Sequence, residues 1–224
     1  MAVIEPPIKD IQNPKRNKKY SAPLRLWHWL SAAVITGSLL TVLLDSTLTN
    51  SHTNAGIIKA QLADNKVSVT NDQARQAAHE ISDKVWTVHT WFGYTLAALL
   101  LFRLIVEFFQ LADQKLIRRI KSAYHQYHII KKDRELARHE LAVKLLYATF
   151  YILLTIMAVT GLCLAFEDDV PALKAIHAIR EIHGFCMYLI IAFIVVHLAG
   201  VFLAERKDSK GIVSDMINGG SETI

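Results

Sequence analysis

Four long apolar segments set the limits of what this chain can fold into. They cover approximately residues 24–44, 85–111, 141–166 and 182–203. Each is long enough to cross the roughly 30 Å of hydrocarbon in a bilayer as an α-helix, which rises about 1.5 Å per residue. None of them contains proline, so straight helices are predicted. Because 52% of the residues are hydrophobic, we expect an all-α integral membrane protein, a four-helix bundle.

Basic residues in the connecting segments predict how the helices are oriented. Residues 1–25, 112–140 and 205–224 together hold 17 Lys and Arg, whereas residues 45–85 and 167–181 hold 6. Cytoplasmic segments of membrane proteins carry the excess of positive charge, so both termini are predicted to be cytoplasmic. This bias explains the formal net charge of +5 without a nucleic-acid partner, and the basic runs suit anionic lipid headgroups.

The predicted organisation follows from these spans and their orientation. A cytoplasmic N-terminal segment of residues 1–23 precedes the membrane domain of residues 24–204, and a cytoplasmic tail of residues 205–224 ends the chain. Within the membrane domain, residues 45–85 form an extracytoplasmic loop. Residues 112–140 form a cytoplasmic loop that begins as a basic extension of the second helix.

The extracytoplasmic loop is long for a simple connection. Its residues 71–84 are polar and rich in Ala, Glu and Gln, and Thr70, Asn71 or Asp72 is placed to cap a short surface helix there. Such a loop serves as a lid over a cofactor, as a docking surface for a partner, or as a plain solvated linker.

The two cysteines, Cys163 and Cys186, lie in apolar stretches and belong to no C-x-x-C pair. A disulfide framework, a zinc site or an iron–sulfur ligand set is therefore not expected.

Histidines inside the apolar segments are the main functional signal. Of ten histidines, four fall within predicted spans: His28, His89, His183 and His197. An ionisable side chain in a membrane span is costly and indicates function. A single one is equally well explained as a hydrogen-bonding residue between helices.

The spacing of these histidines favours the functional interpretation. His183 and His197 are 14 residues apart, which is about 21 Å along a helix and only about 40° short of four full turns. Both rings therefore lie on one face, one in each leaflet. His28 matches His197 in depth near the cytoplasmic side, and His89 matches His183 near the other side.

Two pairs of imidazoles at two depths predict two haem b groups stacked across the bilayer. The pairs are His28/His197 and His89/His183, with each imidazole as an axial ligand of the haem iron. Two protein ligands on one iron leave no open position, which favours electron transfer over oxygen chemistry.

Neighbouring residues agree with such a site. Gly93, Gly184 and Gly200 lie beside ligand histidines and would let a porphyrin approach the backbone, although they also suit ordinary helix packing. Arg103 lies 14 residues after His89 on the same face. It is predicted to pair with haem propionates, with snorkelling to the interface as the alternative. Four tryptophans near the ligands are explained as interface anchors: Trp27, Trp29, Trp86 and Trp91.

Several stretches around these residues carry a family resemblance. They are APLRLWHWL (22–30), VHTWFGYTLAALLLFR (88–103), TGLCLAF (160–166), EIHGFCMYLIIAFIVVHLAG (181–200) and the tail ERKDSKGIVSDMINGG (205–220). Between about residues 20 and 220, the sequence resembles the cytochrome b subunit of membrane-bound nickel–iron hydrogenases, within the bacterial cytochrome b561-like superfamily. The tail favours the hydrogenase branch because haem binding does not require it.

The resemblance implies a function in the bacterial inner membrane. His28, His89, His183 and His197 would be the haem ligands, and Arg103 a position shared with the family. Electrons would pass from the iron–sulfur small subunit of a Ni/Fe-hydrogenase, the partner of its large subunit, through both haems to quinone. The chain itself lacks the cysteine ligands of a hydrogen-activating site, so it would be the electron-transfer subunit of a hydrogen:quinone oxidoreductase.

Two other functions fit the same four histidines. One is a stand-alone cytochrome b561-type oxidase that passes electrons from a small periplasmic donor such as superoxide to quinone. The other is a membrane anchor for a c-type cytochrome. The outer segments hold 6 basic and 9 acidic residues, which does not favour an anionic donor. His139, Lys144 and Glu107 are candidates for a quinone site, and each is equally explained as an interfacial residue.

Overall fold

The computed structural model confirms the four predicted spans as helices. It describes residues 8–9, 16–18, 21–109, 120–121, 124–125, 127, 134–206, 211–220 and 222–223. The helices long and apolar enough to cross a membrane are α1 (Ala22–Thr47), α3 (Asn71–Phe109), α5 (Arg134–Ala165) and α7 (Ala178–Arg206). At most 28% of the apolar window of any of them is buried within the protein, so their large apolar side chains are left for lipid to cover. The chain is a multi-pass membrane protein.

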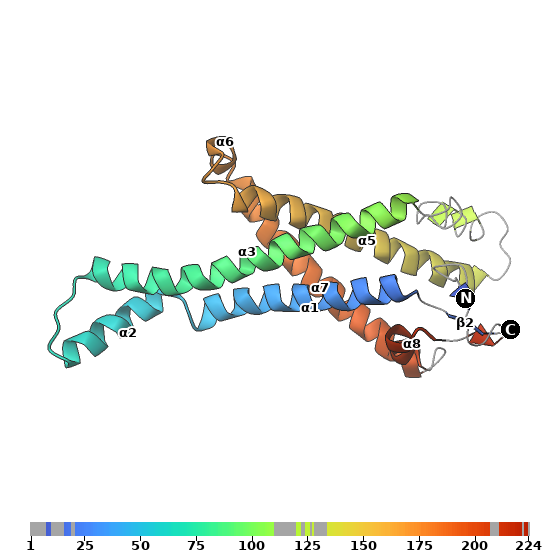
Figure 1. The fold of residues 1–224 in the computed structure, drawn as a ribbon, viewed down its shortest axis with the longest axis horizontal. Helices are drawn as coiled ribbons and strands as arrows, with labels where there is room; N and C mark the ends of the chain where they lie inside the picture. Colours follow the sequence, from blue (N-terminus) through green and yellow to red (C-terminus); the bar gives the residue numbers. More distant parts are fainter. Residues whose placement is uncertain are drawn as a thin grey trace. The chain divides into compact units, whose positions relative to one another are not determined.

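The chain divides into two units (Figure 1). The terminal unit comprises residues 1–29 and 99–224, and the hairpin unit comprises residues 30–98.

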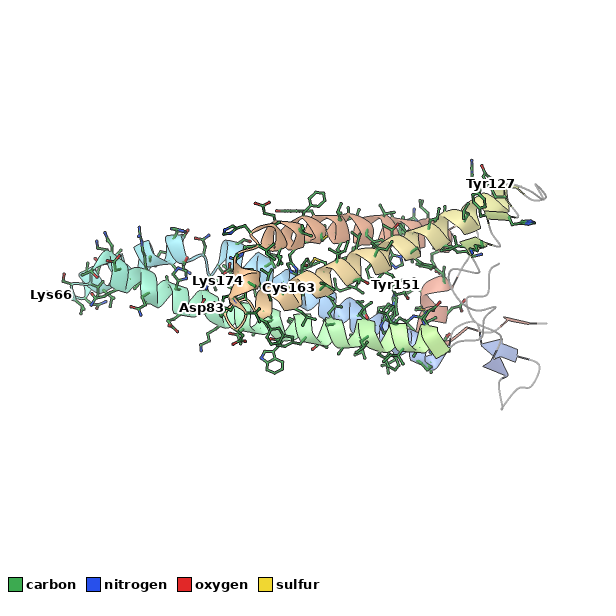
Figure 2. The ribbon with its side chains drawn as sticks, turned by 90° about the horizontal axis from the view of Figure 1, so that it is seen from above. Lys66, Asp83, Tyr127, Tyr151, Cys163 and Lys174 are labelled. Carbon is green, nitrogen blue, oxygen red and sulfur yellow. The ribbon has the colours of Figure 1, made fainter. Side chains whose placement is uncertain are left out.

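The hairpin unit holds most of α1, the helix α2 (Ser51–Asp64) and the first 28 residues of α3. Asn50 caps α2, because its side chain accepts hydrogen bonds from the backbone of His52 and Thr53. Helices α2 and α3 lie side by side (Figure 1), and their contact is made of small residues, with Ala55, Ala74 and Ala78 all buried. Lys66, in a left-handed turn with φ of 60°, marks the tip (Figure 2).

Helix α3 is longer than the sequence predicts. Residues 71–84 are helical, but they continue into the membrane span as one helix and do not form a separate surface helix. The cap is the predicted Thr70, whose hydroxyl accepts from the Gln73 backbone while the Gln73 side chain accepts from the Thr70 backbone. This reciprocal capping box removes the need for a break before the span.

The terminal unit is built on α5 and α7, which pack along their length. Phe150 and Phe193 stack with ring centres 4.6 Å apart, and Leu154 is fully buried. Cys163 and Cys186 are free thiols. The short helix α6 (Pro171–Lys174) lies between α5 and α7 in sequence, and α8 (Ile212–Asn218) follows α7.

A small antiparallel sheet departs from the all-α expectation. Strand β2 (Arg16–Lys18) pairs with β1 (Ile8–Lys9) on one side and with β3 (Glu222–Thr223) on the other. Strands of two or three residues are too short to carry an alternating apolar pattern, so the sequence gave no sign of them. The pairing joins the N-terminal segment to the tail. The predicted loop of residues 112–140 lies largely outside the described residues.

Candidate functional site

The terminal unit brings His28 and His197 together. Their ring centres are 6.3 Å apart, with 58° between the ring planes. A metal–imidazole bond is about 2 Å long and the ring centre lies about 1 Å beyond the nitrogen, so two imidazoles on opposite sides of one ion have centres about 6 Å apart. The angle between planes is free to vary by rotation about those bonds. The pair therefore fits two axial ligands of one haem iron.

Aromatic rings hold this pair in place. Phe193 lies one turn before His197 on α7 and stacks on its ring, at 5.9 Å with only 4° between the planes. Trp29 meets His28 edge-on at 5.2 Å. The buried Nδ1 of His28 has no hydrogen-bond partner among the described residues.

Trp27 is a packing residue, and the prediction that it anchors the interface is wrong. Only 8% of it is exposed. Its Nε1 donates to the Leu99 carbonyl at 2.9 Å, and its ring stacks on Tyr151 at 6.0 Å. The sequence could not reveal this, because the face of α1 that meets α3 and α5 is set by packing. Trp86 and Trp91 are exposed, as an interfacial position requires.

Arg103 belongs to the same cluster. Its Nε donates to the Tyr151 hydroxyl at 3.0 Å, and its Nη2 lies 3.2 Å from Glu107. Tyr151 in turn stacks on Trp27, beside His28 in sequence. Other N–H groups of the guanidinium are left to meet an anionic ligand. Glu107, a quinone-site candidate, is placed here as the ion-pair partner of Arg103.

His89 lies in the hairpin unit with its ring held by α1. Its Nδ1 is 2.8 Å from the Thr41 hydroxyl oxygen and 3.3 Å from the Ser38 carbonyl. The Thr41 hydroxyl donates its own hydrogen to the Ser38 carbonyl at 2.6 Å. Nδ1 therefore carries the hydrogen and donates to both oxygens, which leaves Nε2 with a free lone pair.

His183 is held in the same way within the terminal unit. Its Nδ1 lies 3.0 Å from the Thr160 hydroxyl oxygen, and that hydroxyl donates to the Ile156 carbonyl at 2.7 Å. A Cβ on Gly161 would lie 3.1 Å from the His183 ring, so the glycine makes room for the imidazole. Sequence reasoning missed both threonines, since threonine is common in membrane helices and nothing in its spacing marks a contact with histidine.

The glycines beside the histidines leave open space. At Gly93, Gly184 and Gly200, no described atom lies within 4 Å of the position that a Cβ would occupy. Gly37 instead meets the ring of Phe92, with 2.5 Å to the nearest ring atom. The three predicted glycines thus suit the close approach of a flat ligand, whereas Gly37 serves helix packing within the hairpin unit.

The tail reaches the residues around His28. Arg25 donates from Nη1 to the Ile217 carbonyl, and Trp29 donates from Nε1 to the Met216 carbonyl at 3.2 Å. These bonds satisfy carbonyls at the C-terminal end of α8, which the helix itself cannot. At the start of α8, Glu205 accepts from the backbone of Gly211. The tail is therefore docked at the end of α1 that carries His28.

The connection between α5 and α7 is held by two ion pairs. Lys174 lies 2.8 Å from Asp168, and Arg180 lies 2.8 Å from Glu167. The hydrogen bond and the charge of Lys174 hold the pKa of the Asp168 carboxyl below its ordinary value. A hollow of about 330 Å³ is lined by Leu164, Glu167, Lys174, Ile176, His177 and Arg180. Its Lys and Arg are both paired with carboxylates, so it holds little net positive charge.

The remaining quinone candidates give no assembled site. Lys144 is half-buried on α5. The side chain of His139 lies outside the described residues.

The fold and these residues define a helical, multi-pass membrane protein that carries imidazoles inside its spans. The sequence model of the prokaryotic cytochrome b561 family matches residues 19–219, and the chain belongs to this family. No curated protein and no solved structure matches it. Family membership makes the chain a membrane cytochrome b that functions in electron transfer, and the family typically binds haem b.

Proposed function

We propose that this chain is a di-haem electron-transfer subunit, with His28/His197 and His89/His183 as the axial ligand pairs. The single observation that carries the proposal is the 6.3 Å separation of the His28 and His197 rings, which suits two imidazoles on one iron. The haem iron, when bound, supplies reversible one-electron chemistry. The histidines hold the iron, and two of them per iron leave no position for oxygen.

The second pair is proposed from spacing and from the state of each ring. His183 lies 14 residues before His197 on the same helix, and His89 is predicted to match it in depth. Each has Nδ1 bonded to a threonine hydroxyl on the preceding span. Metal-binding histidines characteristically donate their second ring nitrogen in this manner, which leaves the first free for the metal.

The haem content of the purified chain tests this proposal. We expect a b-type absorbance spectrum with two haems per chain, and its loss when His183 and His197 are both replaced by Ala. Single replacement of His197 by Ala is expected to remove one haem. His177→Ala, at an exposed histidine just before α7, is the matched control. A chain without b-type absorbance, or a double variant with an unchanged spectrum, overturns the proposal.

We further propose that the electron donor is a periplasmic oxidoreductase, with a Ni/Fe-hydrogenase first among candidates, and that the acceptor is membrane quinone in the bacterial inner membrane. The resemblance of the tail (205–220) supports the hydrogenase branch. The hollow near α6 supports it over the rival donor superoxide, because its basic residues are already neutralised.

Purification in mild detergent distinguishes the donors. Recovery of hydrogenase small and large subunits with the chain is the expected result. Recovery of a c-type cytochrome supports the anchor function instead, and reduction of the isolated chain by superoxide supports the stand-alone oxidase. Either result overturns the hydrogenase assignment while leaving the haem ligands intact.

A further inference from the structure

Two buried threonines stand in the same relation to two histidines. Thr41 on α1 lies against His89 on α3, and Thr160 on α5 lies against His183 on α7. Thr41 is 6% exposed and Thr160 is 9% exposed. Each contact is internal to one unit, the first to the hairpin unit and the second to the terminal unit.

The hydroxyl hydrogen of each threonine is already committed. Thr41 donates to the Ser38 carbonyl at 2.6 Å, and Thr160 donates to the Ile156 carbonyl at 2.7 Å. A hydroxyl has one hydrogen to give and two lone pairs to accept with. Each threonine oxygen can therefore only accept from the imidazole, and Nδ1 must be the protonated nitrogen.

We propose that Thr41 and Thr160 are positioning residues that hold His89 and His183 in the Nδ1–H tautomer, with Nε2 directed to the iron. This inference rests on the proposed di-haem function. It adds residues that set how strongly the His89/His183 pair donates to its metal.

The physical effect of such a bond is on both geometry and electronics. Donation from Nδ1–H fixes the rotation of the ring and makes Nε2 a stronger base. A stronger donor stabilises ferric iron more than ferrous iron and so lowers the reduction potential of the haem. His28 differs, because its buried Nδ1 has no partner among the described residues. The two haem sites are thus built with different support.

Valine and serine at the two threonines separate the hydroxyl from its shape. Thr41→Val and Thr160→Val keep the volume and remove the acceptor, whereas Thr41→Ser and Thr160→Ser keep the acceptor. In the purified full chain, we expect each valine variant to raise the midpoint potential of one haem and to weaken its binding by roughly 10–100-fold. The other haem stays unchanged, and both serine variants behave as the unmodified chain.

Matched controls come from threonines with the same backbone bond and no histidine contact in the described structure. Thr155 donates to the Tyr151 carbonyl at 2.7 Å and Thr47 donates to the Leu43 carbonyl at 2.6 Å, and both are exposed. Thr155→Val and Thr47→Val are expected to leave both potentials unchanged. The g values of the ferric haems give a second readout, because they respond to ligand basicity and not to helix packing.

The outcomes are distinct. Two haems with unchanged potentials and g values in the valine variants overturn this inference and leave the di-haem proposal standing. An unmodified chain without b-type haem overturns both. If valine abolishes both haems, Thr160→Cys provides the test, because a thiol is a weak acceptor. A raised potential then supports the inference and an unchanged one overturns it.

Discussion

At the scale of single residues, Trp27 links three helices around His28. Its side chain bonds to the backbone of α3 at Leu99 and stacks on Tyr151 of α5. Burial of a ring of this size contributes several kcal/mol when the alternative is an empty space. The residue next to a ligand histidine thus does the packing that fixes the start of α1.

We expect Trp27→Phe to lower the free energy of unfolding by about 1–2 kcal/mol, since it removes a buried hydrogen bond and part of a packed ring. Unfolding in mixed detergent micelles measures this. Trp91→Phe is the control, because Trp91 is 66% exposed. Equal effects of the two substitutions would contradict the packing function of Trp27.

Arg103 is predicted to influence the haem held by His28 and His197. A cation near haem propionates favours reduction, so Arg103→Gln should lower the midpoint potential of that haem and spare the other. A redox titration followed at the b-type band measures this. The control is Arg180→Gln, at the opposite end of α7 from His197. An unchanged potential would assign Arg103 to the Tyr151 and Glu107 contacts alone.

The four histidines could be picked out from the sequence because an ionisable group in an apolar segment is conspicuous and a 14-residue interval repeats on one helix face. Thr41 and Thr160 could not. Their contacts depend on how neighbouring helices are rotated, and no spacing along one helix records that rotation. The same limit explains the error at Trp27.

At the scale of elements, Gly37 and Phe92 set the approach of α1 to α3 within the hairpin unit. A methyl group at Gly37 would lie 2.5 Å from the Phe92 ring, a distance at which the ring must move. Gly37→Ala is therefore expected to cost about 1–3 kcal/mol through overpacking.

The double variant Gly37→Ala with Phe92→Leu tests the cause. The two effects should not add, because the smaller side chain relieves the clash. Gly56→Ala in α2 is the control, as no described atom lies within 4 Å there; it should be neutral or stabilising by up to about 1 kcal/mol. Thermal unfolding in detergent gives all four values, and strict additivity would rule out the proposed contact.

The positions of the spans could be predicted because about 20 apolar residues in a row have few alternatives to a membrane helix. The continuation of α3 through residues 71–84 was harder to predict. A polar sequence rich in Ala, Glu and Gln suits a separate surface helix as well as an extension of the span. What decides is the absence of a break between them, since neither Gly nor Pro occurs from Asn71 to Phe92.

At the scale of the whole molecule, the strand pairing of β2 with β3 joins the two ends of the chain. Four spans return the chain to its starting side, so the pairing and the number of spans agree. The positive-inside rule adds the prediction that this side is the cytoplasm.

Reporter fusions test that orientation. Alkaline phosphatase inserted at Lys66, in the turn between α2 and α3, should be active, because the enzyme requires the periplasm. The same enzyme fused after Ile224 should be inactive, and a fluorescent protein there should fluoresce. The reverse pattern at both positions would show that the basic segments face outward.

The length of α3 has a mechanical consequence. His89 lies 18 residues after Asn71 on one helix, about 27 Å along its axis. No glycine or proline interrupts the interval, and α2 braces its first turns through the alanine contact. The interval is therefore a stiff lever without a joint. Any displacement imposed on the tip near Lys66 arrives at His89 as a tilt of its helix, so a protein bound at the tip would strain the ligand without touching it.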